Sequence, residues 1–337
     1  MDSDESNYSV DKKLTAWFDK NTFHFREFKN IRELVELKGE KTISVGIPTL
    51  NEEETVGKVI DVIRRRLVEQ RPLVDEIVVI DSGSTDNTKQ VAKEQGAKFY
   101  TASKYLKGYE KNKGKGHNLW TSQYLMKGDI LCWVDADIKQ FKSRFVFALV
   151  GPLLKYPELS YAKAFYKRPI EMEGTGDEKV MLPAGGGRVG EICVRPLFNH
   201  FFPELSGFIQ PTSGEFAGRR ELFEQLPFGV GYGIETSLLI DIWHKFGLNV
   251  MAQCDLERRI HRNQSIRALS KMSFAIMQVV FNRAQELNRL KLLRDISNEY
   301  RFPRKLYKGY YLDSQKIRET YNPPIIENEQ YMKKFNK

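Results

Sequence analysis

Three short apolar runs in the first 140 residues each end in a cluster of polar residues. The runs cover residues 43–48, 76–81 and 131–134. Segments with apolar residues at helical spacing separate them, as in residues 56–63. Apolar strands that alternate with amphipathic helices indicate an α/β fold with a mostly parallel sheet. A further strand is expected over residues 97–100 and a further helix over residues 118–126.

The polar clusters coincide with the carboxyl ends of the predicted strands. They comprise residues 48–52, 81–85 and 135–137. Ligands of parallel sheets bind at that edge, so we expect the three clusters to meet at one binding site. The first cluster has a simpler explanation, because Asn51 can be the N-cap of the next helix with Glu54 at the capping-box position. The turn after Ser82 can likewise cap the helix that follows it.

The third cluster holds two carboxylates, Asp135 and Asp137, with one residue between them. In an extended backbone these side chains point to the same side and repel each other unless a cation lies between them. Mg²⁺ or Mn²⁺ takes such oxygen ligands and leaves positions for phosphate oxygens. The pair therefore predicts a metal–diphosphate site, although Asp-x-Asp also commonly ends a strand in solvent.

The charge balance and the cysteines narrow the class of protein. The 337 residues include 53 basic and 44 acidic ones, a net charge of +9 that suits anionic small molecules. No basic stripe with interleaved aromatic residues indicates nucleic-acid binding. Cys132, Cys193 and Cys254 are far apart among apolar residues, which favours packing roles and a reducing compartment. Without a secretory segment or an apolar run long enough to span a membrane, we expect a cytoplasmic protein.

The chain divides into four predicted parts. They are a polar tail with short helices (1–40), the α/β unit (41–139), a Gly-rich part with helices near 191–198 and 235–246 (140–262), and a C-terminal region (263–337). The last part opens with a long amphipathic helix over residues 266–292. Its apolar face predicts a homodimer interface, unless the face packs wholly inside its own subunit. The last forty residues are expected to wrap the surface.

The order of these motifs resembles that of nucleotide-sugar glycosyltransferases with the GT-A fold, and later motifs resemble the glucosyl-3-phosphoglycerate synthase family. These are Gly-Lys-Gly (114–116), Val-Gly-Pro-Leu-Leu (150–154), Phe-Tyr-Lys-Arg-Pro (165–169), Gly-Gly-Gly-Arg-Val (185–189), Gln-Pro-Thr-Ser-Gly-Glu (210–215), Pro-Phe-Gly-Val-Gly-Tyr-Gly-Ile-Glu (227–235) and His-Arg-Asn (261–263). The resemblance spans residues 41–285. It implies a retaining, metal-dependent, dimeric enzyme that moves glucose from a nucleoside diphosphate, UDP-glucose above all, to 3-phosphoglycerate.

The resemblance also implies roles on the donor side, with residues 41–139 as the nucleotide-sugar-binding unit. The implied nucleotide-sugar contacts are Pro48, Thr49, Leu50, Asn51, Glu52, Ser82, Lys115, Asp135, Ala136, Tyr232, Glu235, Arg259 and Arg262. Two of these roles have simpler alternatives. Lys115 lies in a basic Gly-rich segment that can be a solvated loop, and Glu235 can be a first-turn carboxylate favoured by the helix dipole.

For the metal and the acceptor, the resemblance implies residues mostly in the part 140–262. Asp137 and His261 become the metal ligands, and Gly187, Arg188, Gly190 and Asn263 the acceptor contacts. The family pattern has Thr where this chain has Gly190, which weakens the phosphate assignment. The backbone carbonyl of Thr212 is expected to orient the acceptor hydroxyl, and Glu235 to bind glucose hydroxyls. Residues 185–189 can alternatively form a mobile surface loop.

Other functions stay open from the residues alone. Gly190 leaves transfer to unphosphorylated glycerate as an alternative, and the sequence does not distinguish glucose from mannose or fix the nucleotide. Transfer to a polyprenyl phosphate or a polysaccharide is a further alternative, although the Gln-x-x-Arg-Trp motif of processive enzymes is missing. Outside enzymes, a positively charged chain can be a nucleic-acid-binding module, which steeply salt-dependent binding would reveal.

Overall fold

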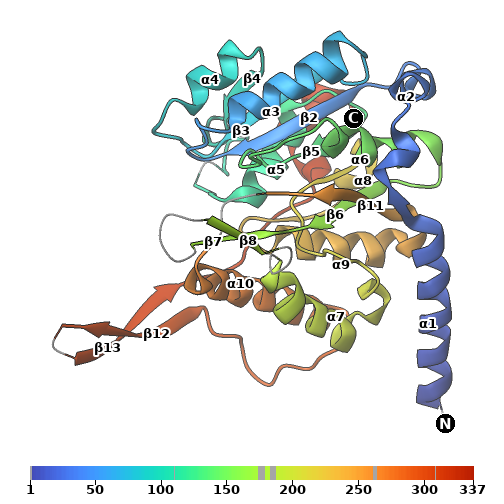
Figure 1. The fold of residues 1–337 in the computed structure, drawn as a ribbon. Coiled ribbons are helices and arrows are strands. Elements are labelled where there is room, and N and C mark those ends of the chain that lie inside the picture. The colour runs from blue at the N-terminus through green and yellow to red at the C-terminus, as the bar shows by residue number, and fades with distance from the viewer. Residues whose placement is uncertain (1, 110, 174–178, 183–186, 261–263, 308) are drawn as a thin grey trace.

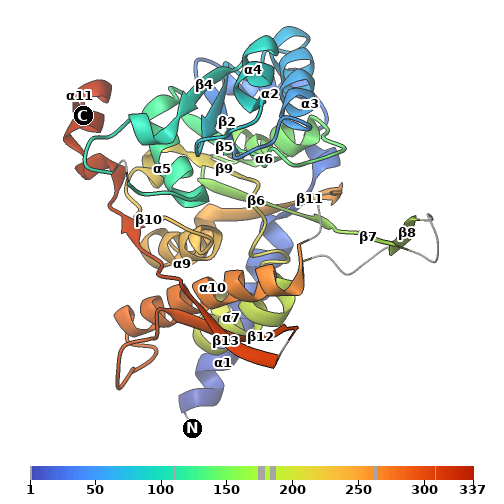
Figure 2. The ribbon, with the colours of Figure 1, turned by 90° about the vertical axis from the view of Figure 1, so that its left-hand side faces the viewer.

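An eight-stranded sheet crosses the molecule, with helices on both of its faces (Figures 1 and 2). The computed structural model describes residues 2–109, 111–173, 179–182, 187–260, 264–307 and 309–337. The strand order is β1 (Thr22–His24), β11 (Met251–Arg258), β6 (Tyr161–Lys167), β9 (Phe216–Arg219), β5 (Ile130–Trp133), β2 (Ile43–Thr49), β3 (Glu76–Asp81) and β4 (Lys98–Thr101). Within this sheet, β9 is antiparallel to β5 and β6, and the other described pairs are parallel. The predicted α/β fold is therefore confirmed.

The described helices fall into two layers. They are α1 (Asp2–Asn21), α2 (Ile31–Lys38), α3 (Val56–Ile63), α4 (Thr88–Glu94), α5 (Lys115–Leu125), α6 (Arg144–Lys155), α7 (Arg195–Phe201), α8 (Arg220–Phe223), α9 (Ile234–Phe246), α10 (Ile266–Glu286) and α11 (Glu329–Phe335). Short 3₁₀ segments lie at Phe25–Phe28, Ala102–Lys104, Pro203–Leu205, Leu248–Val250 and Ile325–Glu327, and π segments at Arg64–Glu69 and Gly190–Val194. Helices α2, α3, α4 and α6 share one core, and α5, α7, α9 and α10 share the other.

Alternating residues of the central strands enter these two cores. In β3, Ile77 and Val79 belong to the core of α3 and α6, whereas Val78 and Ile80 belong to the core of α5 and α9. Successive side chains of a strand point to opposite faces, so a sheet covered on both faces needs an unbroken apolar run. This arrangement explains why the central strands appear in the sequence as continuous apolar segments.

The cysteines are packing residues, as predicted. Cys132, Cys193 and Cys254 are buried and free. Burial raises the pKa of the Cys193 thiol, so it is held in the neutral, unreactive form.

In the described part of the chain, none of the helices combines the length and the apolar character that crossing a bilayer requires.

The predicted start of the first α/β helix is wrong. Helix α3 begins at Val56, after Thr55, so neither Asn51 nor Glu54 holds a capping-box position. Asn51 instead has a left-handed backbone (φ 57), and its Oδ1 accepts a hydrogen bond from the backbone N–H of Thr85 at 2.9 Å. The amide therefore joins the first two polar clusters across the strand ends rather than capping its own helix.

Residues 2–21 form α1 instead of the predicted polar tail. Near its end, Trp17 is 3% exposed and its ring lies 4.9 Å from that of Phe208. The indole N–H donates to the carbonyl of Met251 at 2.8 Å. Composition alone could not reveal this helix, because its anchoring partners are more than 190 residues away.

The C-terminal region consists of a projecting hairpin and a segment that follows the body of the protein. Strands β12 (Glu299–Leu306) and β13 (Gly309–Lys316) form a hairpin that extends away from the body (Figure 1). The chain then returns along the body, where β14 (Tyr321–Asn322) pairs with β10 (Phe228–Gly229). The expected wrapping therefore holds for residues 317–337 and not for the hairpin. A separate two-stranded sheet joins β7 (Ile170–Glu173) to β8 (Lys179–Leu182) (Figure 2).

The predicted dimer surface on α10 is corrected by burial. Val279 is fully buried within its own subunit, and Met272 packs partly buried against the same core. The apolar face of this helix is occupied by the chain's own α7 and α9. The predicted dimer surface is therefore wrong for this part of α10, whose apolar face packs within its own subunit or lines the cavity described below.

Candidate active site

The carboxyl ends of β2 and β3 and the segment after β5 open into one cavity of about 640 Å³. Its lining includes eleven residues of the predicted donor set and one predicted metal ligand, Asp137. The eleven are Pro48, Thr49, Leu50, Glu52, Ser82, Lys115, Asp135, Ala136, Tyr232, Glu235 and Arg259. The lining also includes Gly187, Arg188 and Thr212 from the predicted acceptor and catalytic sets. Residues from three strand ends and from several other segments of the chain thus face a single space.

The remaining predicted residues do not line this cavity in the described structure. Asn51 is turned toward Thr85. Gly190 is the first residue of the π segment, and an added Cβ there would lie 3.2 Å from Oγ1 of the lining residue Thr212. His261, Arg262 and Asn263 lie outside the described residues.

The strand ends of β2 and β3 are locked together by Asp81. Its carboxylate accepts hydrogen bonds from Thr49 Oγ1 at 3.1 Å and from the backbone N–H groups of Gly83 and Ser84 at 2.8 Å. Gly83 has a φ of +104°, which a glycine adopts without strain. The residues after Ser82 thus form a turn on Asp81, which fixes Ser82 at the cavity wall. The predicted cap is wrong in detail, because α4 begins only at Thr88, with Asn87 as its N-cap residue.

Lys115 is the first residue of α5, rather than part of the expected loop, and lies between two carboxylates. Its Nζ is 2.7 Å from Asp135 Oδ1 and 2.8 Å from Glu235 Oε1. Burial lowers the pKa of Lys115, but the two carboxylates outweigh burial and raise that pKa above its ordinary value. The cavity therefore contains a permanently charged ammonium group. At Gly114 an added Cβ would overlap the carbonyl oxygen of Val230, so this tight approach requires glycine.

Arg259 connects the end of β11 to the carboxylate pair. Its Nη2 lies 2.9 Å from Asp135 Oδ2 and 2.8 Å from Asp137 Oδ1, and its Nη1 lies 2.7 Å from Glu215 Oε1. Burial raises the pKa of Asp135, but Lys115 and Arg259 outweigh burial and hold that pKa well below its usual value. For the fully buried Glu215, burial prevails over Arg259 and raises the pKa. The repulsion expected between Asp135 and Asp137 is thus relieved by a guanidinium group.

The carboxylate pair fits a hard divalent ion through one member in particular. Asp135 is held by two cations, whereas the side chain of Asp137 keeps a third of its surface exposed at the cavity. Across the described ranges, no group of three or more His, Cys, Asp or Glu side chains is spaced to hold a metal. An ion bound to Asp137 would therefore take its other ligands from phosphate oxygens and water, as Mg²⁺ typically does in proteins.

Several residues that line the cavity were not predicted from the sequence. Arg168 is one of them: its guanidinium lies 5.0 Å from the Tyr166 ring and donates to the Tyr166 hydroxyl at 3.0 Å. The sequence did hint at a role in the site, because Arg168 lies in the family motif 165–169. The apolar part of the wall comes from Leu269, Met272 and Ile276 of α10. Their helical spacing was visible, but the sequence argument assigned that face to a dimer.

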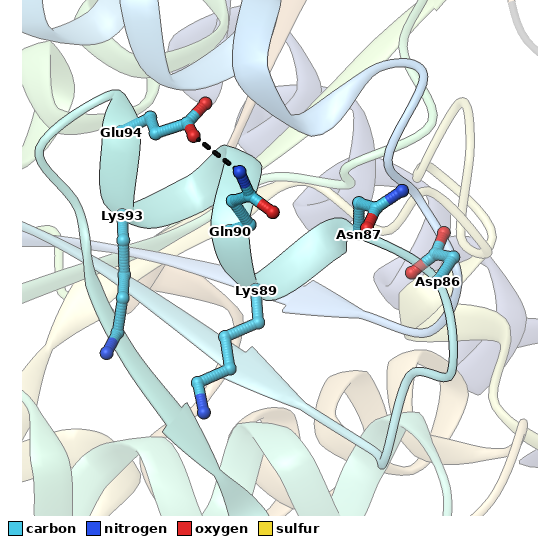
Figure 3. A pocket seen from close by; sticks show the side chains of 6 residues that line it. All are labelled: Asp86, Asn87, Lys89, Gln90, Lys93 and Glu94. Atoms are coloured by element: carbon cyan, nitrogen blue, oxygen red, sulfur yellow. Dashed lines mark hydrogen bonds between the residues drawn. The ribbon is translucent and has the colours of Figure 1, made fainter.

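A second hollow of about 400 Å³ follows the outer side of α4 (Figure 3). It is lined by Asp86, Asn87, Lys89, Gln90, Lys93 and Glu94. Gln90 donates to Glu94 within it at 2.9 Å, as the dashed line in Figure 3 shows. All six side chains belong to one helix and the turn before it, so no second element converges on a ligand here. The strand-end cavity is therefore the better candidate for the active site.

A mostly parallel sheet with a carboxylate pair and a charged lysine at its strand ends defines a nucleotide-sugar glycosyltransferase of the GT-A type. The model of glycosyl transferase family 2 matches residues 44–227. Over 320 residues the chain is 48% identical to glucosyl-3-phosphoglycerate synthase of Petrotoga mobilis, and the match covers 94% of this chain and 97% of that relative. The chain therefore belongs to glycosyl transferase family 2 and, within it, to the glucosyl-3-phosphoglycerate synthase family.

Solved structures agree with this assignment. Mannosyl-3-phosphoglycerate synthase from Rubrobacter xylanophilus superposes with a TM-score of 0.84 at 36% identity, covering 93% of this chain and 97% of that one. Glucosyl-3-phosphoglycerate synthase from Mycobacterium tuberculosis, in complex with Mn²⁺, UDP-glucose and phosphoglyceric acid, gives 0.75 at 36% identity, covering 88% and 94%. The same relative has also been solved with Mg²⁺ and UDP.

Proposed function

We propose that this chain transfers glucose from UDP-glucose to 3-phosphoglycerate, with retention of configuration and with the help of Mg²⁺ or Mn²⁺. One observation supports this most strongly: Lys115, the pair Asp135 and Asp137, and Arg188 all face one cavity. An ammonium and a carboxylate pair suit a nucleoside diphosphate, and a guanidinium suits an anionic acceptor. The family and its solved complexes point to the same two substrates.

On the donor side, the segment 48–52 holds the uridine, Glu52 the ribose hydroxyls, and Ser82 the nucleotide. Lys115 stabilises the negative charge that develops on the leaving diphosphate, and its two carboxylate partners fix it in place. A bound Mg²⁺ or Mn²⁺, held by Asp137 with His261 as a second ligand, would neutralise the same charge. Asp135, through its pairs with Lys115 and Arg259, organises the group. The other donor contacts in this proposal are Ala136, Arg259 and Arg262.

On the sugar and acceptor side, Tyr232 and Glu235 face the glucose. Arg188 binds the phosphate or carboxylate of 3-phosphoglycerate, with Gly187 and Asn263 beside it. The carbonyl of Thr212, which lines the cavity, orients the acceptor hydroxyl against the anomeric carbon on the leaving-group face. The hydroxyl proton then passes to the departing diphosphate oxygen, so that no covalent glycosyl-enzyme is needed.

A product assay tests this proposal. The protein is incubated with UDP-glucose and Mg²⁺ and offered 3-phosphoglycerate or glycerate, and the products are separated and examined by NMR. We expect α-linked glucosyl-3-phosphoglycerate and UDP, with much less product from glycerate. A β-linked product would refute retention, and hydrolysis of UDP-glucose without any acceptor product would refute the transferase itself.

Gly190 favours unphosphorylated glycerate as a second candidate acceptor. The family pattern has a Thr hydroxyl at this position, and the structure places the site of its Cβ next to Thr212 at the cavity wall. Without that hydroxyl the phosphate loses one hydrogen-bond donor. If glycerate is the true acceptor, its kcat/KM exceeds that of 3-phosphoglycerate in the same assay.

Mannose is a second candidate sugar, because the Rubrobacter relative with the same fold is a mannosyl-3-phosphoglycerate synthase. The donor series is therefore extended to GDP-mannose and to other nucleoside diphosphate glucoses. We expect UDP-glucose to have the highest kcat/KM of the series.

We further infer a homodimer and a cytoplasmic location. The β12–β13 hairpin supports the first inference, because Tyr307, Tyr310 and Leu312 on it are between 69% and 105% exposed. Large apolar side chains on a projecting arm are typical of a surface that another chain covers. Three buried, unpaired cysteines support a reducing compartment. Light scattering that gives a monomer mass at micromolar concentration would contradict the dimer, and fractionation of cells would test the location.

A further inference from the structure

The loop of residues 229–233 carries the sugar-facing part of the cavity. Tyr232 is 58% exposed on it and lines the cavity, and Glu235 follows in the first turn of α9, paired with Lys115. The N-cap residue of α9 is Gly233, which has no side chain to cap the helix. The free N–H groups at the start of a helix need acceptors from elsewhere.

One side of this loop is closed by the turn that carries Lys115. The backbone N–H of His117 donates to the carbonyl of Val230 at 3.2 Å. A Cβ on Gly116 would overlap the carbonyl oxygen of Gly229, so the two backbones are in direct contact. The loop and the lysine are therefore positioned together.

The other side is closed by the C-terminal segment. Val230 N–H donates to the carbonyl of Thr320 at 2.8 Å, and β10 pairs with β14 just beyond it. The carboxylate of Glu319 lies against the backbone of the loop: a Cβ on Gly231 would overlap its Oε1, and a Cβ on Gly233 would lie 3.4 Å from its Oε2. Glycine at these positions thus lets a carboxylate reach the amino end of α9, where the helix dipole favours a negative charge.

Glu319 is itself firmly anchored. Its backbone N–H donates to Gln278 Oε1 at 3.2 Å, and Gln278 Nε2 donates to the carbonyl of Ile317 at 3.0 Å. Burial raises the pKa of Glu319 to about 6, while the backbone N–H groups of residues 231–233 act in the opposite direction. Within the described residues, the buried Oε2 of Glu319 makes no hydrogen bond, so burying this acid is costly. The loop N–H groups beside the carboxylate stabilise its charge electrostatically.

We propose that Glu319 is a positioning residue: its carboxylate holds the backbone of residues 231–233, and thereby fixes Tyr232 and Glu235 for reaction with the donor sugar. The inference rests on the proposed transfer of a sugar from UDP-glucose. Glu319 follows Glu235, the cavity residue on α9, by more than eighty residues in the sequence. The inference therefore gives the C-terminal segment a role in the reaction. Displacement of a positioned group by about 1 Å can lower a rate by up to about 100-fold.

The test compares Glu319→Ala and Glu319→Gln with Glu299→Gln, a matched control whose ion pair with Arg301 is exposed on the hairpin. For each protein, kcat and KM are measured with UDP-glucose, and the stoichiometry of UDP binding is measured by calorimetry. UDP lacks the sugar, so its stoichiometry reports the folded fraction. We expect kcat to fall about tenfold or more in E319A and about threefold in E319Q at unchanged stoichiometry, and to stay within about twofold in E299Q.

Two results would overturn the inference. One is a fall in kcat that only parallels a loss of UDP-binding sites, which would show a purely structural role. The other is a wild-type kcat in E319Q, which decides the matter even if E319A does not fold. Inactivity of the wild-type protein with every donor would instead refute the proposed function, so the two failures are distinguishable.

Discussion

The two sides of the cavity are held in different ways. On the donor side, Asp135 and Asp137 belong to a buried network in which Lys115 and Arg259 balance the carboxylates. On the acceptor side, Arg188 lies at the wall with one described hydrogen bond, to the carbonyl of Gln264 at 3.2 Å. Removing a charge from a buried network leaves its partners uncompensated, whereas removing a charge from the wall removes mainly a ligand contact. Changes at the buried members of the donor-side network, above all Arg259, should therefore impair both folding and turnover. A change at the partly exposed Asp137 should impair turnover, and acceptor-side changes mainly affinity.

Arg259→Gln should have the largest effect and is the strongest test of this difference. The guanidinium is 4% exposed and pairs with three carboxylates, one of them the fully buried Glu215. We expect the free energy of unfolding to fall by about 3–5 kcal/mol and turnover to be lost. Denaturant unfolding measures the first effect. Arg26→Gln, whose pair with Glu257 is exposed, should change stability by less than about 0.5 kcal/mol. Similar losses of unfolding free energy in both variants would show that the buried network is no more important for stability than an exposed ion pair.

Asp137→Ala should reduce kcat by at least about 1,000-fold, or roughly 4 kcal/mol, with the protein still folded. Asp137 is partly exposed and follows a strand rather than lying in the core. Steady-state assays and a circular dichroism melt measure the two effects, with Asp313→Ala on the hairpin as control. Removal of metal with EDTA should have the same effect on the wild-type protein as the substitution. Full activity after chelation would contradict the metal requirement.

Arg188→Ala should raise the KM for 3-phosphoglycerate about 10- to 100-fold and leave the donor affinity nearly unchanged. A charge-assisted hydrogen bond contributes about 1.5–3 kcal/mol. Its free energy of unfolding should match that of the wild type, because the side chain is not part of the buried network. Initial-rate measurements with each substrate varied provide the check, with Arg304→Ala on the hairpin as control. An equal loss for UDP-glucose would place Arg188 on the donor side.

Lys163→Met should change how the free energy of unfolding depends on pH. Lys163 is 1% exposed and donates to the carbonyl of Ser213 at 2.8 Å, next to Thr212. Burial lowers the pKa of Lys163 to about 7, so the unfolded chain binds this proton at a higher pH than the folded protein does. The free energy of unfolding therefore rises between about pH 7 and pH 10, by at most about 1.4 kcal/mol per pH unit from this residue.

Urea unfolding at several pH values between 7 and 10 measures this slope. The slope should be smaller in K163M than in the wild type or in Lys20→Met, whose ion pair with Glu158 is exposed. Equal slopes in all three proteins would show that Lys163 stays charged when folded at high pH, against the effect of its burial.

The donor side could largely be predicted from the sequence because its residues follow strands, and strand ends are visible as apolar runs that stop at polar residues. Asp135, Asp137 and Ser82 were placed in this way. Asn51 was misplaced, because a local cap and a bond across the sheet to Thr85 use the same amide, and only the folded chain shows which one forms. Glu319 was missed because no local pattern distinguishes it from a surface charge and its partner Gln278 is distant in the sequence. Arg168 was missed although it lies in the motif 165–169 and pairs with the nearby Tyr166. The acceptor residues were predicted by resemblance alone.

The most direct test of the account is a set of four calorimetric titrations. UDP with Mg²⁺ and, separately, 3-phosphoglycerate are titrated into Asp137→Ala and into Arg188→Ala, with the wild type as reference. We predict that D137A loses UDP binding and keeps 3-phosphoglycerate binding, and that R188A shows the reverse. A substitution that weakens both ligands to the same extent would contradict a cavity divided into a donor side at the strand ends and an acceptor side around Arg188.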